Sequence, residues 1–209
     1  MSKIPELKLS KKGMELIDFY KFMVEVGYRN DYFNPGKYNI ILKKIFDEYK
    51  IKTVLDYGAG RGSWEQKIYN DNTISALEYF NLEKVYQYEP TISNSKKIIM
   101  DCVLCFDVLE HVFISDLKNV ISDLYNYAKK TVIIQVACYN ANAKLPNGEN
   151  AHVTVRDPMW WKGFLDSVST EFEEINTLLI CTTKEKKVLS FKIWSAKRWY
   201  QVPNYKVDF

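Results

Sequence analysis

Apolar residues recur at helical spacing in two stretches near the start of the chain. One amphipathic helix is predicted over Lys12–Val26. The apolar face of a second predicted helix is formed by Tyr38, Ile41, Leu42, Ile45, Phe46 and Tyr49. Asn34 followed by Pro35 marks its predicted start, because proline is favoured at the first helical position. This second helix is expected to cover one side of a sheet.

Short runs of β-branched and aromatic residues predict strands further along the chain. These runs are Ile51–Leu55, Lys84–Tyr88, Met100–Phe106, Thr131–Ala137, Ile175–Thr182 and Lys187–Ser195. Helices are predicted from Leu117 to Ala128 and over Met159–Val168, between the later strands. The last two strands are joined by a short charged turn, which permits only an antiparallel pair.

Strands that alternate with helices predict a Rossmann-like, doubly wound α/β fold with a mostly parallel sheet and a C-terminal antiparallel hairpin. The polar stretch Thr91–Ile99 is too short for a helix and a strand, so the third βα unit is predicted to be shortened. We expect all 209 residues to form a single domain. Residues 1–50 would be an N-terminal helical cover, 51–195 the α/β core and 196–209 a tail.

The composition adds few constraints. A net charge of +3 requires neither a nucleic-acid nor a membrane partner. The apolar runs are too short to span a membrane, and the N-terminus lacks the apolar core of a signal peptide. We therefore expect a cytoplasmic protein, or one made in a host cytoplasm if the gene is viral. Cys102 and Cys105 should lie buried on opposite faces of one strand, and no metal site is predicted.

A glycine-rich loop follows the first predicted strand. That strand ends at Asp56 and runs into Gly58, Gly60 and Gly62, which lets the backbone approach a ligand closely. The next residues, Ser63–Phe80, are predicted to be mostly helical, with an interruption around Asn70–Asn72. If Ser63 opens a helix, the loop would present its ligand to the N–H groups of that helix. The dinucleotide fingerprint would need a further glycine directly after Gly62, which argues against a nicotinamide oxidoreductase.

Polar side chains follow other strands at the same edge of the predicted sheet. Glu89 ends the second strand, where a carboxylate can accept hydrogen bonds from ribose hydroxyls; the alternative is a solvated loop residue. His111 and His152 are the only histidines, and both are expected at the carboxyl edge. Imidazole titrates near neutral pH, which makes both candidate general bases. The alternative is a structural role, with His111 and Glu110 capping the following helix.

Aromatic and basic residues near this edge have two interpretations. Trp160 and Trp161 fit the core better than an acceptor pocket, and Tyr28–Phe33 fit packing better than ligand capping. Arg156 could bind an acidic acceptor. The tail contains Arg198 and several aromatic residues, which either pack back or bind a partner.

Three motifs in order, LDYGAGRG, YQYEP and FDVLEH, resemble class I S-adenosylmethionine (SAM) dependent methyltransferases, including those of quinone-biosynthesis type. The later LPNGENAH, followed by a helix with two tryptophans, resembles a subset of bacterial and phage methyltransferases of unassigned substrate. The resemblance covers Thr53–Trp161 and, through the final hairpin, most of the domain. It implies the class I methyltransferase fold.

The resemblance also implies roles for individual residues. Asp56, Gly58 and Gly60 would hold the methionine part of SAM, and Gly62 would allow close packing of the helix start. Glu89 would bind the ribose hydroxyls, while Asp107 and Val108 would lie beside the transferable methyl. Two departures from the family are the short link from Glu89 to Asp101, which removes the usual adenine contact, and Trp64, where relatives have smaller residues.

The function implied is methyl transfer from SAM, with S-adenosylhomocysteine as product, to an O or N of a small molecule such as a sugar or a surface-polysaccharide precursor. One alternative is a nucleic-acid or protein methyltransferase. Against it, the N-P-P-Y type motif is absent and the excess of Lys and Arg is small. Another alternative is a non-catalytic, SAM-binding partner subunit.

Overall fold

A computed structural model describes residues 4–27, 36–185 and 187–197. Its centre is a six-stranded sheet with the order β4-β1-β5-β6-β7-β8, in which all neighbours are parallel except β7 and β8. The strands are β1 (Thr53–Tyr57), β4 (Lys84–Tyr88), β5 (Met100–Phe106), β6 (Ala128–Ala137), β7 (Asn176–Thr182) and β8 (Val188–Ser190). The predicted α/β class, mostly parallel sheet and closing antiparallel hairpin are confirmed.

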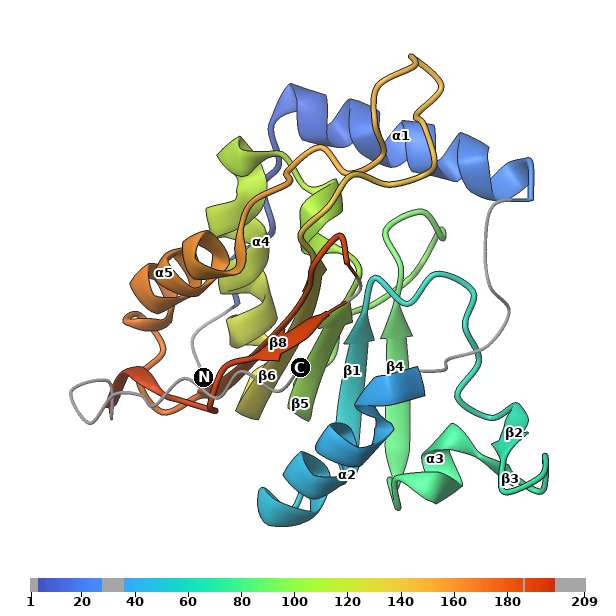
Figure 1. Cartoon of the computed structure of the whole chain (residues 1–209), viewed down its shortest axis with the longest axis vertical. Coiled ribbons are helices and arrows are strands. Elements are labelled where there is room, and N and C mark those ends of the chain that lie inside the picture. The colour runs from blue at the N-terminus through green and yellow to red at the C-terminus, as the bar shows by residue number, and fades with distance from the viewer. Residues whose placement is uncertain (1–3, 28–35, 186, 198–209) are drawn as a thin grey trace.

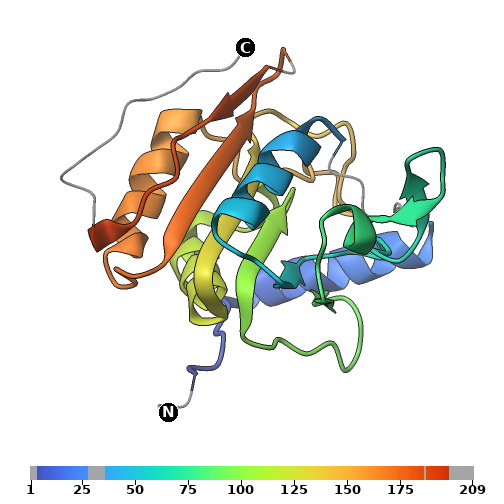
Figure 2. The same cartoon turned by 90° about the horizontal axis from the view of Figure 1, so that it is seen from below.

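Helices cover both faces of this sheet (Figures 1 and 2). One face packs against α4 (Ile114–Asn126) and α5 (Pro158–Ser169), and the other against α2 (Asn39–Glu48) and the four-residue α3 (Ala76–Tyr79). A short 3-10 turn, Gly36–Tyr38, precedes α2. The prediction that the helix before the first strand covers one side of the sheet is confirmed. Its predicted start at Asn34 and Pro35 lies outside the described residues.

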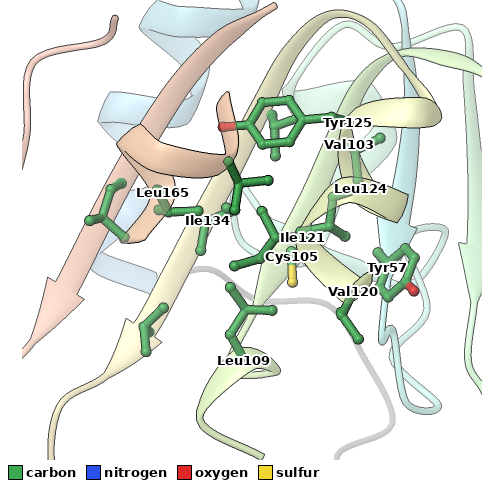
Figure 3. Packing of buried hydrophobic residues seen from close by; sticks show 14 of the residues in the cluster. Tyr57, Val103, Cys105, Leu109, Val120, Ile121, Leu124, Tyr125, Ile134 and Leu165 are labelled. Atoms are coloured by element: carbon green, nitrogen blue, oxygen red, sulfur yellow. The ribbon is translucent and has the colours of Figure 1, made fainter. Parts of the chain in front are cut away.

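The core consists of two apolar layers, one on each face of the sheet. Figure 3 shows the layer in which Val103 and Cys105 of β5 and Ile134 of β6 meet Ile121 of α4. Cys102 belongs to the opposite layer, and both cysteines are fully buried. Alternate residues of a strand point to opposite faces, so a strand buried on both sides is apolar throughout. The predicted burial of the two cysteines is confirmed.

The segment after the glycine loop differs from its prediction. Ser63 does not open a helix; instead a small antiparallel hairpin forms from β2 (Lys67–Tyr69) and β3 (Ile74–Ser75), followed by α3. Asn70, Asp71 and Asn72 have left-handed backbones with φ of 48°, 56° and 63°, which reverse the chain between the two strands. Asn and Asp tolerate this conformation better than other non-glycine residues. The predicted helix over Ser63–Phe80 is therefore wrong, except for its last turn.

The region between β4 and β5 contains neither helix nor strand, which confirms the shortened third βα unit. As a result β4 is an edge strand, paired only with β1.

Helix α1 (Lys11–Glu25), predicted over nearly the same residues, crosses the end of the sheet to which the parallel strands point (Figure 1). Its N-cap, Ser10, donates from both backbone N and Oγ to the buried carboxylate of Asp116 in α4, each at 2.7 Å. A Cβ at Gly13 would lie 2.4 Å from the same carboxylate, so glycine is what permits this close approach. Among the described residues, no helix is long and apolar enough to cross a membrane.

A matched pair of substitutions in α4 tests the packing. Ile121 is fully buried, whereas Ile114 on the same helix is 43% exposed. We expect Ile121→Ala to lower the free energy of unfolding by roughly 2–5 kcal/mol, through lost burial and the cavity left behind. Ile114→Ala should change it by less than about 0.5 kcal/mol. Equilibrium unfolding in urea measures both, and equal losses would contradict this assignment of the core.

Candidate active site

A cavity of about 570 Å³ lies at the carboxyl end of the sheet, beneath α1. The end of β1 lines it with Gly58, the end of β4 with Glu89, and the end of β5 with Asp107, Val108 and His111. Five of the nine residues singled out from the sequence thus line one cavity. Asp56, Gly60, Gly62 and His152 do not line it. The cavity is within the size range of small-molecule and cofactor sites.

The N-terminal segment contributes a cavity wall that the sequence did not reveal. Leu7 and Leu9 line the cavity, as do Leu16, Ile17 and Tyr20 of α1. The amphipathic pattern of α1 predicts a buried face, but periodicity alone does not show which surface that face covers. The structure places it over the strand ends.

The glycine loop touches β5 at one point. Gly58 has φ of +78°, and a Cβ built on it would lie 2.4 Å from Cγ2 of Val108. The backbone N–H groups of Gly58 and Ala59 donate to the carbonyl of Tyr88 at 2.7 and 3.1 Å. Both the backbone conformation and the contact exclude a side chain here, so glycine at this position brings the first and third motifs together.

Glu89 fastens the glycine loop to the end of β4. Its buried carboxylate accepts from the N–H of Gly60 at 2.8 Å, and from the N–H and hydroxyl of Thr91 at 3.0 and 2.8 Å. A carboxylate offers about four lone-pair positions, and three are used here. The fourth lone-pair position is on Oε2. Because Glu89 lines the cavity, a bound ligand could donate to this position.

Asp56 lies behind the loop rather than in the cavity. It is 4% exposed, and its Oδ2 accepts from the indole N–H of Trp64 at 2.7 Å. Burial raises the pKa of Asp56 to about 7, against the lowering effect of the Trp64 hydrogen bond. Trp64 therefore shapes this side of the loop as the hydrogen-bond partner of Asp56. Gly62 precedes no helix, so its expected packing against a helix start is wrong.

Asp107 has an unusual backbone where β5 ends. Its φ is +51°, a conformation rarely adopted outside glycine. Its N–H donates to the backbone carbonyl of Gln135 at 3.2 Å and to Oε1 of the same residue at 3.0 Å. Gln135 is a polar residue within the apolar run of β6. A polar residue in a buried strand indicates a hydrogen-bonding function, and here Gln135 accepts from the backbone of Asp107.

His111 is held by contacts to α1 and to the loop after β6. Its Nδ1 is 2.5 Å from the hydroxyl of Tyr20 and 2.9 Å from the carbonyl of Ala151. The hydroxyl of Tyr20 donates its single proton to that carbonyl at 2.8 Å. The proton between the Tyr20 oxygen and His111 is therefore carried by Nδ1. A neutral imidazole protonated at Nδ1 has its lone pair on Nε2.

His152 lies beside His111, although it comes from the long loop after β6. The two ring centroids are 4.8 Å apart, with the rings nearly perpendicular. Nδ1 of His152 contacts the carbonyl of Tyr139 at 2.5 Å; since a carbonyl can only accept, this nitrogen carries the proton. Both imidazoles therefore present Nε2 as the basic atom. The structure thus brings the two candidate bases together.

Glu110 completes a cluster with the two histidines. It is fully buried, and its Oε1 accepts from the N–H of Ala137 at 2.8 Å. Burial, and next the nearby carboxylate of Asp107, raise the pKa of Glu110 well above its usual value. One ligand atom from each of Glu110, His111 and His152 lies within 4.8 Å of the others, which is compatible with binding a metal ion. The spacing of the three residues along the sequence does not predict this cluster, because His152 reaches it from a loop that follows a different strand.

The remaining candidates lie elsewhere. Trp161 is fully buried in the core, and Trp160 stacks on Phe164 beside it. Arg156 donates to the neighbouring backbone and lies over the ring of Trp160. The expectation that the two tryptophans belong to the core is confirmed for Trp161. Tyr28–Phe33 and the tail from Arg198 onward are outside the described residues.

Comparison with known proteins gives no assignment. No protein-family model matches the chain, and no curated protein matches it.

The buried carboxyl of Asp56 predicts a specific pH dependence of stability. Between its unfolded pKa of about 4 and its native pKa of about 7, the native state holds a proton that the unfolded chain releases. The contribution of Asp56 to the free energy of unfolding therefore decreases as pH rises through this range. The total decrease is up to about 4 kcal/mol.

The isosteric variant Asp56→Asn isolates this effect. We expect the variant to match wild type near pH 4 and to become increasingly more stable than wild type up to pH 8. Denaturant unfolding at several pH values measures the difference, and Asp47→Asn, at an exposed position, controls for the loss of one negative charge. A difference between Asp56→Asn and wild type that stays constant from pH 4 to 8 would show that the Asp56 carboxyl is already ionised at low pH.

Proposed function

We propose that this protein is a SAM-dependent methyltransferase that transfers a methyl group to an O or N of a small molecule. The observation that carries the proposal is the meeting of three strand ends at one cavity, with Gly58, Glu89 and Asp107 in its wall. These residues belong to the three motifs that resemble the methyltransferase family. In open α/β sheets, ligands bind at the carboxyl ends of the strands.

The charges around the cavity favour a cationic ligand. Its lining includes the acidic residues Glu89, Asp107 and Asp116, and no lysine or arginine is among the described residues that line it. The glycine loop also leads into a hairpin rather than a helix, so it lacks the helix N-terminus that favours phosphate. SAM has a sulfonium and an ammonium group and no phosphate. The same features weigh against a dinucleotide.

The proposed arrangement of SAM follows from these contacts. The methionine part would lie along the loop at Gly58, where the absence of a side chain admits it. The ribose hydroxyls would use the remaining acceptor position of Glu89. The methyl would then point toward Asp107 and Val108 at the end of β5.

The cover formed by α1 would support the reaction itself. Methyl transfer needs the acceptor atom, the methyl carbon and the sulfur in line, in a site that excludes water. Leu16 and Ile17 line the cavity from α1 with apolar side chains. His111, with Nε2 as its basic atom, is the candidate to accept a proton from a hydroxyl or ammonium acceptor.

Calorimetric titration with SAM and S-adenosylhomocysteine tests the proposal. We expect dissociation constants of about micromolar for the wild type. Gly58→Val should weaken binding at least roughly 100-fold, because its side chain meets Val108 and strains the backbone. Glu89→Gln, which keeps the side-chain shape, should weaken binding by about 10-fold or more through the lost charged acceptor.

Gly163→Val is the matched control, because Gly163 is exposed in α5 with open space around its Cβ position. It should bind SAM as the wild type does, and circular dichroism should show that all variants are folded. A folded wild type that binds neither ligand would contradict the proposal. Binding of SAM without methyl transfer to any small-molecule acceptor would favour the non-catalytic subunit instead.

A further inference from the structure

We propose that Glu110, His111 and His152 form a three-ligand site for a divalent transition-metal ion beside the cavity. One ligand atom from each side chain lies within 4.8 Å of the other two. Ligands bound at about 2.1 Å around one ion lie roughly 3.4 Å apart, so small side-chain rotations close the site. Two imidazoles and one carboxylate are a donor set that suits such ions.

The surroundings of both histidines are those of metal ligands. Metal-binding imidazoles usually donate their second N–H to a carbonyl or carboxylate, which fixes the tautomer and the ring orientation. Here Nδ1 of His111 is held by Tyr20 and the Ala151 carbonyl, and Nδ1 of His152 by the Tyr139 carbonyl. The protonation pattern therefore places the lone pair of each ring on Nε2.

The buried carboxylate of Glu110 supplies an independent argument. Its Oε2 has less than 1 Å² of exposed surface and no hydrogen-bond partner among the described residues. A buried carboxylate without a donor on one oxygen is costly. A cation bound between Glu110 and the imidazoles would remove that cost.

This site has a direct relation to the cavity. His111 lines the cavity, and Glu110 and His152, which do not line it, each have a ligand atom within 4.8 Å of one on His111. Three protein ligands leave coordination positions for an exogenous group, as in catalytic rather than structural metal sites. If the proposed methyl transfer holds, such an ion would bind the acceptor oxygen and lower its pKa, which makes a separate general base unnecessary. The metal site itself does not depend on SAM.

Metal titration of the SAM-free protein tests this inference. After dialysis against EDTA and then metal-free buffer, calorimetry with Mn²⁺ and with Zn²⁺ should show one bound ion per chain. His152→Ala and Glu110→Gln should each weaken binding by at least about 100-fold. Tyr20→Phe, which removes the hydroxyl that contacts Nδ1 of His111 and the Ala151 carbonyl but no metal ligand, should weaken it by roughly 10-fold.

Glu149→Gln is the matched control, an exposed carboxylate in the same loop as His152, and it should bind metal as the wild type does. Circular dichroism and thermal melting verify the fold of each variant. Equal metal affinity of wild type and folded His152→Ala would overturn the inference, as would a wild type that binds neither ion.

SAM titration of the EDTA-treated protein distinguishes a failure of the metal-site proposal from a failure of the methyltransferase proposal. Metal binding without SAM binding would uphold the metal site while contradicting the methyltransferase. SAM binding without metal binding would overturn the metal site and leave His111 as the candidate base.

Discussion

The contact between Gly58 and Val108 is the constraint on which the rest of the site depends. It joins the end of β1 to the end of β5 at a distance that no side chain at position 58 would allow. The carbonyl of Tyr88 and the carboxylate of Glu89 bind the same loop to β4. Three neighbouring strand ends are thereby fixed relative to one another by contacts with the glycine loop. A ligand bound there meets a wall that is already organised, which lowers the entropic cost of binding.

A second constraint is the attachment of α1 to the sheet end. Asp116 accepts two hydrogen bonds from Ser10, and the absence of a side chain at Gly13 lets the helix approach that carboxylate. This attachment brings Tyr20 to His111 and so links the N-terminal helix to the protonation state of the imidazole. The helix therefore both closes the cavity and orients one of its polar groups. Its role at the site comes from this packing, not from any motif of its own.

The sequence predicted the strands well because each central strand is apolar on both faces and ends in a polar or glycine-rich turn. It predicted which residues end those strands, and parallel pairing then placed Gly58, Glu89 and Asp107 side by side. It failed after the glycine loop, where three left-handed residues from Asn70 onward favour a hairpin over a helix. It also could not show that Trp64 bonds to Asp56, because side-chain partners follow from tertiary packing rather than from periodicity.

The two buried carboxyl groups near the cavity show why burial alone does not define a function. Asp56 accepts from an indole N–H, and burial raises its pKa to about 7. Glu110 is surrounded differently: one oxygen is bonded to a backbone N–H, the other has no donor among the described residues, and two imidazoles face it. Imidazole lone pairs cannot stabilise a carboxylate, but all three groups stabilise a cation. The partners of each carboxyl, rather than its depth, therefore distinguish a structural acid from a candidate metal ligand.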